Sequence, residues 1–372
     1  MRAATVFLAA GAIVLAGCAT DAREPGVAAP STSAAPTSTD STTSTPPLAT
    51  SPTPEISTGS PTPTTALLAW EPTGRPAEET VTTGGGWTIV VDQERSLATI
   101  DGPSPLTVAG SKRFRIGDAL LDTGWAVVVR TDSLEERPAV ATVVDLTSGA
   151  KTTIDGRSEV PTTTGGTWAL QGSTLVHATT GPGGAYCLAR RDLATGTAET
   201  VWCAAKRTGF TNARVTPAGL GVMGFDDQRP SCRTLGTVAD GTLTPLPAVT
   251  ACQGWEGVTT DAGVVWSEVP NENRLDEATI HARSGDTVVA LGPATSDTLT
   301  WCAGATYVVR NPQAGGEPAR LLRWTEAGVF ETVYESKGGG QAFLSAPRCG
   351  GDRITVTAYV EGGDEQVSAP LG

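Results

Sequence analysis

The sequence GLGVMG, residues 219–224, spells out the pattern G-x-G-x-x-G, and the carboxylate of Asp240 follows at a distance that could suit a ribose contact. In a dinucleotide-binding protein this pattern must open a helix whose N-terminus meets the pyrophosphate. The residues that follow here, FDDQRPSC, form a polar stretch with a proline, which argues against a helix after Gly224. We therefore predict that these glycines belong to a turn and a strand, and not to a nucleotide site.

Other patterns with catalytic meaning are equally weak in this chain. The stretch SGAK, Ser148–Lys151, matches S-x-x-K, but it falls in an expected β-hairpin turn, where no helical turn brings the lysine onto the serine. No G-x-S-x-G and no P-loop pattern occurs, and the two histidines, His177 and His281, have no acid placed beside them by sequence. We expect both histidines to be structural and predict no catalytic residue, with an exported hydrolase or lyase acting in an axial channel as an alternative.

The N-terminus has the pattern of an export signal. Arg2 precedes an apolar run from Ala3 to Leu15, which is shorter than the roughly 20 residues of a membrane-spanning helix, and the small residues of LAGC lead up to Cys18. The pattern is similar to the signal of bacterial lipoproteins, whose cysteine is lipid-modified and becomes the first mature residue. The resemblance implies a signal peptide at residues 1–17, lipidation of Cys18, and anchoring to the extracytoplasmic face of the cell membrane. An ordinary signal peptide with an incidental Cys18 is the alternative.

The charge of the mature chain narrows its partners. Without Arg2, the mature chain has 25 basic and 39 acidic residues, which gives a net charge of −14. This balance argues against nucleic acid and against electrostatic binding to anionic lipid, so the lipid anchor is the only membrane contact that we expect. No C-x-x-C pair occurs and only two histidines are present, so a zinc site would lack ligands. We predict no metal, no cofactor and a monomer.

A change of composition near residue 65 divides the mature chain. Residues 30–65 contain 28 Ser, Thr or Pro among 36, which leaves almost nothing to bury. We therefore expect residues 18–65 to form a lipid-anchored, disordered linker. From Ala66 onward, strand-like runs of β-branched and aromatic residues alternate with glycine-rich turns, and no long helical periodicity is present.

Two glycine markers repeat along residues 66–372 with a period of about 44 residues. The first lies between two strand-like runs, at Gly102, Gly149, Gly196, Gly241, Gly285 and Gly328. The second precedes a different strand, at Gly86, Gly124, Gly172, Gly219, Gly263, Gly304 and Gly351. A period of this length built only of strands is typical of a β-propeller, in which each blade is a four-stranded antiparallel sheet with strands A to D running outward from the axis. The first marker is then the C–D turn and the second the A–B turn.

The length of the repeat region predicts seven blades. Residues 66–372 number 307, close to seven periods of 44, and the next C–D glycine would fall at the end of the chain. The last blade therefore lacks its own strand D. We expect an all-β, seven-bladed β-propeller in which Ala66–Trp70 supplies the outer strand of the last blade and closes the ring.

Two of the turns carry a family resemblance. DLTSG, Asp145–Gly149, and DLATG, Asp192–Gly196, resemble the D-x-x-[ST]-G hairpin turns of quinoprotein-like and related bacterial propellers. The tryptophan-docking pattern of quinoprotein dehydrogenases is absent, because Trp202 lies too far from Gly196, and the signatures of WD repeats are missing too. The resemblance implies the broad propeller superfamily and its fold, and no particular function.

The six cysteines other than Cys18 suit an exported chain with disulfides. From their places in the repeat we expect the bridges Cys187–Cys203, Cys232–Cys252 and Cys302–Cys349. The first two pairs lie nearly symmetrically about a C–D glycine, so each bridges its own hairpin. The third pair lies before the A–B glycines of adjacent blades, so it links blades six and seven near the axis.

The B–C and D–A loops emerge on one face of a propeller, and here the B–C loops are longer and more polar than the turns of the other face. Binding residues concentrate on such loops. Our candidates on the B–C side are Glu135, Arg137, Asp226, Asp227, Arg229, Glu268, Asn271 and Arg274. Those on the D–A side are Lys112, Arg113, Arg115, Lys206 and Arg207. Trp255 and Trp301 lie on or beside inner strands, where we expect packing between blades ahead of a place at the channel mouth.

Taken together, these features favour a non-catalytic binding or scaffolding module for a protein or glycan of the cell envelope. Besides the hydrolase or lyase, an accessory sensor or assembly factor of a membrane complex is the other alternative.

Overall fold

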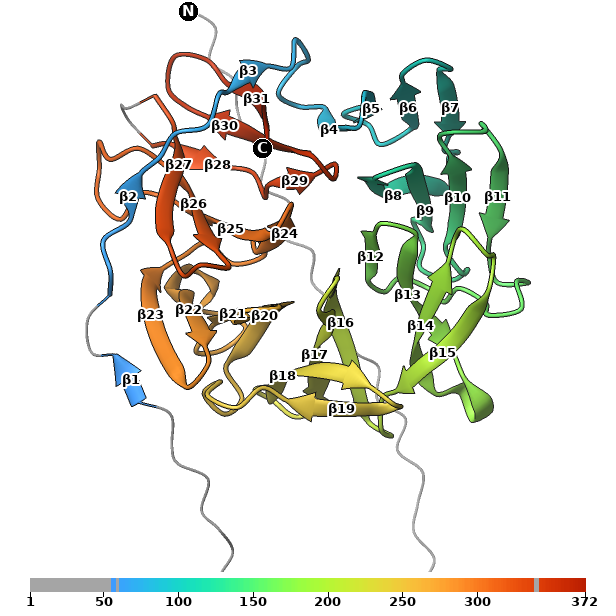
Figure 1. The fold of residues 1–372 in the computed structure, drawn as a ribbon. Helices are drawn as coiled ribbons and strands as arrows, with labels where there is room; N and C mark the ends of the chain where they lie inside the picture. The colour runs from blue at the N-terminus through green and yellow to red at the C-terminus, as the bar shows by residue number, and fades with distance from the viewer. Residues whose placement is uncertain (1–54, 58–59, 338–340) are drawn as a thin grey trace, which may run out of the picture. The chain divides into compact units, whose positions relative to one another are not determined.

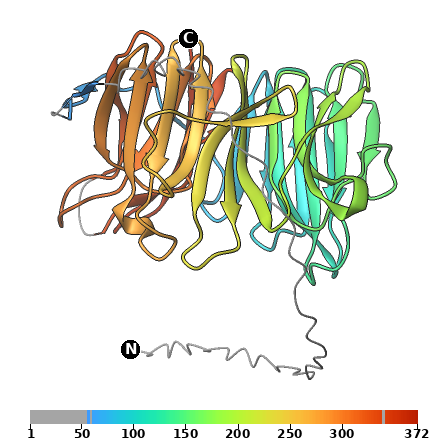
Figure 2. The ribbon, with the colours of Figure 1, turned by 90° about the horizontal axis from the view of Figure 1, so that it is seen from below.

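The computed structural model describes residues 55–57, 60–337 and 341–372, so the expected signal peptide, Cys18 and most of the expected linker lie outside the described residues. Seven β-sheets surround a central axis (Figure 1), and their strands run between the two faces of the ring (Figure 2). The only helices in the described ranges are the short 3₁₀ helices η1 (Pro182–Gly184) and η2 (Leu275–Glu277). None of the described helices is long and apolar enough to cross a membrane. The predicted all-β, seven-bladed propeller is confirmed.

The first four blades follow the predicted A-to-D order from the axis outward. Blade 1 comprises β4 (Thr80–Gly84), β5 (Trp87–Val91), β6 (Leu97–Asp101) and β7 (Leu106–Ala109). Blade 2 comprises β8 (Phe114–Asp122), β9 (Trp125–Asp132), β10 (Val140–Asp145) and β11 (Lys151–Ile154). Blade 3 comprises β12 (Trp168–Gln171), β13 (Thr174–Thr180), β14 (Tyr186–Asp192) and β15 (Ala198–Cys203). Blade 4 comprises β16 (Thr208–Thr216), β17 (Gly219–Asp226), β18 (Arg233–Ala239) and β19 (Thr242–Pro245).

The last three blades each include a strand from the N-terminal part of the chain. Blade 5 comprises β20 (Gly254–Thr260), β21 (Gly263–Glu268), β22 (Thr279–Ser284), β23 (Thr287–Pro293) and the added strand β1 (Glu55–Ser57). Blade 6 comprises β24 (Thr300–Cys302), β25 (Ala305–Arg310), β26 (Arg320–Thr325), β27 (Phe330–Glu335) and the added strand β2 (Thr64–Thr65). Blade 7 comprises β28 (Phe343–Leu344) and β29 (Arg348–Cys349) on β30 (Arg353–Tyr359), then β31 (Glu365–Pro370) and β3 (Glu71–Pro72).

The second strand of a blade is strongly apolar because neighbouring blades cover both of its faces. In β9, the four residues from Ala126 to Val129 are completely buried. A sheet covered on both faces reads as a continuous apolar run, whereas a half-exposed strand alternates. The outermost strand lies at the rim, and β11 accordingly exposes the polar residues Lys151, Thr152 and Thr153. This contrast within each blade fixes which strand lies inside.

Successive blades from 1 to 7 are joined by six apolar clusters, one for each gap. The seam between blades 7 and 1 carries polar contacts: the amide of Gly85 donates to Asp352 Oδ1 at 2.8 Å, and Gln366 Nε2 donates to the carbonyl of Glu79 at 2.8 Å. Gly84 and Gly350 approach backbone to backbone there, and neither leaves room for a Cβ atom. Glycine is therefore required at this seam for close approach.

The marker glycines stand at the turns that the repeat predicted. All seven A–B glycines have positive φ, as at Gly124 with φ 81°, where residues other than glycine are strained. Gly102 is the C–D marker without a positive φ, and its Cα instead faces the ring of Trp87, which leaves no room for a side chain. Residues 219–224 lie in β17, so the strand prediction for GLGVMG is confirmed and no helix follows Gly224.

All three expected disulfides are present. Cys187–Cys203 joins β14 to β15, and Cys232–Cys252 joins the residue before β18 to the loop after β19. Cys302–Cys349 joins the inner strands β24 and β29, and thereby blades 6 and 7. Their positions follow from the repeat, because equivalent ends of neighbouring strands meet at the same face.

The prediction that a strand from the N-terminal part of the chain completes the last blade is confirmed, but the residues predicted for it, Ala66–Trp70, are wrong. That strand is β3, in which Glu71 and Pro72 pair antiparallel with β31. Ala66 and Leu68 donate their amides to carbonyls of β27 in blade 6, at 2.9 and 3.1 Å. The physical reason is burial: Leu68 and Trp70 pack on the apolar cluster between blades 6 and 7, whereas the rim position is exposed and suits Glu71 and Pro72.

The end of the expected linker contacts the propeller. Residues 55–57 pair in parallel with Thr287–Val289 of β23, and residues 64–65 pair in parallel with Glu331–Thr332 of β27. The N-terminal segment therefore covers the outer edges of blades 5 and 6 before it completes blade 7 (Figure 1). An outer strand that is covered in this way no longer exposes unpaired backbone groups.

Candidate functional site

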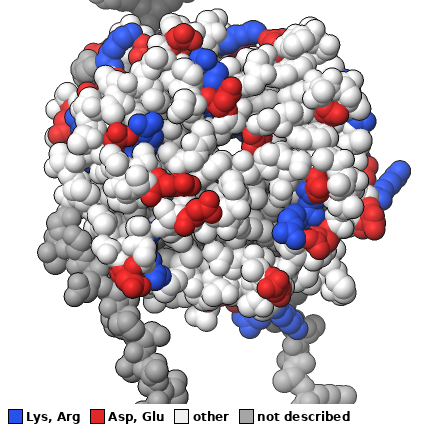
Figure 3. Space-filling view, in the orientation of Figure 1, with Lys and Arg blue, Asp and Glu red and all other residues white. Residues whose placement is uncertain are grey.

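The inner strands of the propeller enclose a cavity of about 240 Å³ around the axis. Its walls come from β4, β8, β12, β16, β24 and β29, together with the loops that precede β24 and β29. Figure 3 shows a narrow opening near the centre of one face, with acidic side chains at its edge. Because the walls are sheet strands, the groups that line the cavity are held by rigid elements.

Arg348 of β29 connects three blades on one side of the cavity. Its Nη2 lies 3.2 Å from Asp118 Oδ1 of β8 in blade 2 and also donates to the carbonyl of Ala119. Its Nε donates to Thr82 Oγ1 of β4 in blade 1 at 2.7 Å. The guanidinium of blade 7 thus joins the two blades beyond the seam.

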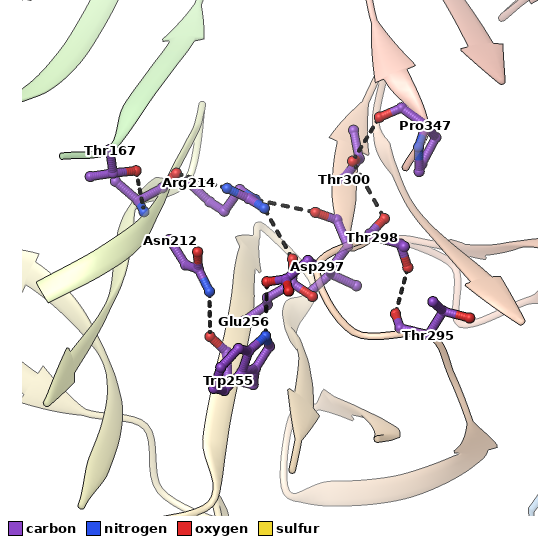
Figure 4. A network of polar contacts seen from close by, with 12 residues as sticks. Thr167, Asn212, Arg214, Trp255, Glu256, Thr295, Asp297, Thr298, Thr300 and Pro347 are labelled. Atoms are coloured by element: carbon purple, nitrogen blue, oxygen red, sulfur yellow. Dashed lines mark hydrogen bonds and ion pairs between the residues drawn. The ribbon is translucent and has the colours of Figure 1, made fainter. Parts of the chain in front are cut away.

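Arg214 of β16 makes the corresponding connection across the axis (Figure 4). Its Nη2 donates to Glu256 Oε1 of β20 in blade 5 at 3.0 Å, and its Nε donates to the carbonyl of Leu299, just before β24, at 3.2 Å. Asp297, in the loop before β24, accepts a hydrogen bond of 2.9 Å from Trp255 Nε1. Blades 4, 5 and 6 therefore meet in one polar network.

β-Bulges place these charged groups at the axis. The pairing register shifts between Ile116 and Asp118 in β8, between Thr211 and Arg214 in β16, and between Gly254 and Glu256 in β20. A bulge adds a residue to one strand and re-aims the side chains beside it, and bulges are frequent next to functional sites. Three of the charged residues in the two networks directly follow such a bulge.

Glu256 lies outside the cavity wall and holds a residue that lines it, Arg214. Burial raises the pKa of Glu256 to about 7; Arg214 opposes this shift, and the negative charge of Asp297 adds to it. Its side chain is completely buried and is not part of the cavity wall. Glu256 therefore holds the guanidinium of Arg214 and does not itself reach a ligand.

Apolar and aromatic surface completes the walls. Trp301 of β24 is half-buried and lines the cavity, together with Leu120 and Leu170. Trp168 also lines it and stacks on the completely buried His177, with ring centroids 5.0 Å apart. Burial lowers the pKa of His177 to about 4, so this histidine is neutral and acts as packing.

The second histidine also lies against a tryptophan. His281 stacks on Trp266 with centroids 5.3 Å apart, and its Nε2 is 4.0 Å from Glu268 Oε2. Burial lowers the pKa of His281, and the nearby Glu268 partly opposes this. Neither histidine lines the axial cavity. Across the described ranges, no group of three or more His, Cys, Asp or Glu side chains is arranged to hold a metal ion.

Arg113, a predicted binding residue, holds a loop. Its guanidinium donates to Asp132 at 3.0 and 2.8 Å and to Glu136 at 2.7 Å. The hydrogen bonds from Arg113 are the main cause that lowers the pKa of Asp132 to about 2. Asp132 also accepts the amides of Glu136 and Arg137, so the loop that carries the candidates Glu135 and Arg137 folds around one carboxylate.

Asp226 and Asp227 likewise have partners within the chain. Asp226 Oδ1 accepts the amides of Gln228 and Cys232, which shapes the B–C loop of blade 4. Asp227 pairs with Arg207 at 2.7 Å, so these two predicted residues lie together at the surface. Arg229 is exposed.

The prediction that Glu268 is a binding residue on a surface loop is wrong, because Glu268 is buried. It accepts hydrogen bonds from Trp266 Nε1 at 2.9 Å and from the amide of Thr250 at 2.8 Å. It was misplaced because it ends β21 facing inward, while the rest of its loop is outside. Asn271 caps the amide of Asn273, and Arg274 pairs with Glu277.

The remaining predicted residues lie on the D–A side. Lys112 and Lys206 are exposed, and Arg115 donates to the carbonyl of Glu94 at 3.2 Å. None of the thirteen predicted binding residues lines the axial cavity. Loops are the usual place of binding residues, whereas most of the charged residues of the cavity lie on inner strands. The signal for them in the sequence is a charged residue inside an expected inner strand, as in IGDAL, NARVT and APRCG.

Comparisons with known proteins show the fold. No protein-family model and no curated protein matches the chain. Among solved structures, it is similar to the β-propeller domain of the trilobed protease from Pyrococcus furiosus, with a TM-score of 0.52 and 9% identity over 77% of this chain and 96% of that one. That domain is reported to have an open velcro topology, whereas here β3 completes the last blade.

Two further structures have lower TM-scores. Oligogalacturonate lyase from Vibrio parahaemolyticus has a TM-score of 0.49 at 11% identity, over 82% of this chain and 98% of that one. TolB from Acinetobacter baumannii has a TM-score of 0.40 at 18% identity, over 70% of this chain and 64% of that one. At such identities the likeness extends to the propeller fold alone. The chain is thus a seven-bladed β-propeller with a polar axial cavity, and the quinoprotein-like resemblance stays a prediction.

Proposed function

We propose that this chain is a non-catalytic binding protein of the cell envelope, tethered by lipid at Cys18, and that its propeller holds a protein or glycan partner at the axial cavity. The observation that carries the proposal is the convergence of Arg214, Arg348, Asp118 and Asp297 on one cavity lined by Trp301. A concave site with a few convergent polar groups and aromatic surface is what ligand binding requires.

The charged side chains of the cavity are held in fixed positions, which favours a binding site. Arg348 and Arg214 are each held by three acceptors or more, so their positions are set before a ligand arrives. Preorganised groups lose little conformational freedom on binding. Among the predicted loop residues, Arg207 and Asp227 pair with each other, but both side chains are largely exposed and do not line the axial cavity.

Export is supported by two features of the chain. Three disulfides join the six cysteines of the propeller, and structural disulfides persist in oxidising compartments outside the cytoplasm. The net charge of −14 for the mature chain suits a soluble module that does not lie on anionic lipid. Lipidation at Cys18 and a monomeric state belong to the proposal.

The test is capture of a partner from detergent-solubilised envelope and from an envelope polysaccharide fraction, with the full mature chain carrying a C-terminal tag. Wild type should retain a partner, Trp301→Ala should lose it, and Trp324→Ala, which alters a tryptophan of the same blade outside the cavity, should keep it. Combined replacement of Asp226, Asp227 and Arg229 by alanine tests the loop face. If only this triple variant loses the partner, the binding site lies on the loops. If wild type captures no partner, the proposal is contradicted.

A further inference from the structure

We propose that the axial cavity binds a neutral saccharide unit, which it recognises through paired carboxylates and guanidinium groups and through the indole of Trp301. This inference rests on the proposed function and names the chemical class of the ligand. It is carried by three properties of the cavity: the presence of charges of both signs in its lining, the hydrogen-bonding capacity left on these groups, and its size.

Charges of both signs line the cavity, with the carboxylates of Asp118, Asp122 and Asp297 and the guanidinium groups of Arg214 and Arg348. Asp118 lies beside Arg348 at 3.2 Å, and Asp297 belongs to the same network as Arg214 (Figure 4). A charged ligand of either sign would be attracted by one kind of group in the lining and repelled by the other. A hydroxyl group both donates and accepts, so it satisfies a carboxylate and a guanidinium at once. A neutral ligand with several hydroxyl groups therefore matches this lining best.

The ion pairs leave capacity for a ligand. Arg214 and Arg348 each keep 28% of their side-chain surface exposed, and Asp118 keeps 34%. Within the described ranges, no hydrogen bond engages Nη1 of Arg348 or Oδ2 of Asp297. Solvent reaches these groups, so the hydroxyl groups of a ligand in the cavity can replace water as their hydrogen-bond partners.

The aromatic wall and the volume point to one sugar ring. Trp301 is half-buried and contributes indole surface to the wall, next to Leu120 and Leu170. A large aromatic ring offers a flat apolar area, against which the C–H face of a sugar can pack. At 240 Å³ the cavity is slightly smaller than the roughly 300–1,000 Å³ of drug-sized pockets. It fits a single unit, such as the end of a glycan, and excludes a folded protein surface.

The experiment measures binding of defined probes to the full mature chain by saturation-transfer NMR and titration calorimetry. The neutral probes are mannose, galactose, arabinose and N-acetylglucosamine; galacturonate and glucosamine supply a negative and a positive ring of similar size. Short uncharged and charged peptides test the other ligand class. We expect at least one neutral sugar to bind, and at least tenfold more tightly than both charged rings and all peptides.

Two variants locate the site. Trp301→Ala removes the indole wall, and Asp297→Asn removes a carboxylate while its amide oxygen still accepts from Trp255 Nε1. Each should weaken sugar binding at least tenfold, Asp297→Asn at an unchanged Tm and Trp301→Ala at a lower Tm, because Trp301 also packs on the apolar cluster between blades 5 and 6. Trp324→Ala removes another tryptophan that packs on this cluster but lies outside the cavity, and it should bind like wild type.

Three results would overturn the inference: preference for a charged ring, binding of peptides alone, or sugar binding that both cavity variants retain. Absence of binding by every neutral sugar at 10 mM would overturn it as well. The proposed function fails separately, when wild type captures no envelope partner. Capture that depends on Trp301 without sugar binding would leave the binding function intact and refute the saccharide assignment.

Discussion

Replacing Glu256 by glutamine should change how the stability of the protein depends on pH. The carboxyl group is completely buried, and burial raises its pKa from the ordinary 4.5 to about 7 despite the guanidinium of Arg214 at 3.0 Å. The folded chain thus holds this proton more tightly than the unfolded chain does. The stability that protonated Glu256 contributes is fully present below pH 4.5 and is lost as the pH rises through 7. Glutamine has the same shape and no proton to lose.

The magnitude follows from the displacement of the pKa. One pKa unit corresponds to about 1.4 kcal/mol, so the free energy of unfolding of wild type, measured relative to Glu256→Gln, should fall by about 3 kcal/mol between pH 4.5 and 7. Above pH 7 the difference should level off. Other carboxylates titrate equally in both proteins and cancel in the comparison.

The assay is urea denaturation of both proteins at half-unit steps from pH 4.5 to 8. Glu199→Gln is the matched control, since Glu199 also pairs with an arginine, Arg190, but is 60% exposed. Its stability difference from wild type should stay flat, because exposed ion pairs contribute little. A flat difference for Glu256→Gln as well would refute the reasoning, because it would mean that Arg214 keeps the buried carboxylate ionised throughout.

Three further predictions concern the ring. Replacing Cys302 and Cys349 together by serine opens a loop with a sequence separation of 47 between blades 6 and 7, and urea denaturation should show a loss of about 4 kcal/mol. Deleting residues 1–72 removes β3, so amide exchange in β31 should accelerate and Tm should fall; unchanged exchange would show that β3 does not stabilise the last blade. Gly350→Ala forces a Cβ against the backbone of blade 1 and should cost 1–3 kcal/mol, whereas Gly315→Ala, which meets nothing within 4 Å, should stay within about 0.5 kcal/mol of wild type.

Features that repeat locally were predictable from the sequence. Turn glycines such as Gly124 are needed wherever φ is positive, and this requirement depends on a few neighbouring residues only. The spacing of these glycines predicted the blades, and the places of the cysteines relative to the glycines predicted the disulfides.

Features that depend on ring closure were not predictable in the same way. Ala66–Trp70 has the pattern of a strand, but its apolar side chains pack between blades 6 and 7, and the closing pair falls two or three residues later. Glu268 has the sequence setting of a loop residue, yet its carboxylate is turned inward onto Trp266. The blades that decide the place of Ala66–Trp70 are distant in sequence, whereas Glu268 is held by Trp266, two residues away, and by the amide of Thr250 in the preceding loop.

The axial cavity also separates what the sequence determines from what only the tertiary structure decides. The sequence by itself determined an all-β chain, the number of blades, their turns and the cysteine pairs, because each of these follows from short-range pattern and a fixed period. Only the tertiary structure decided that Asp118, Arg214 and Arg348 meet at the axis. The bulges in β8 and β16 and the closure of the ring bring those residues together from three different blades, and a shift of one residue in any of these inner strands would turn its charge to the opposite face of the sheet.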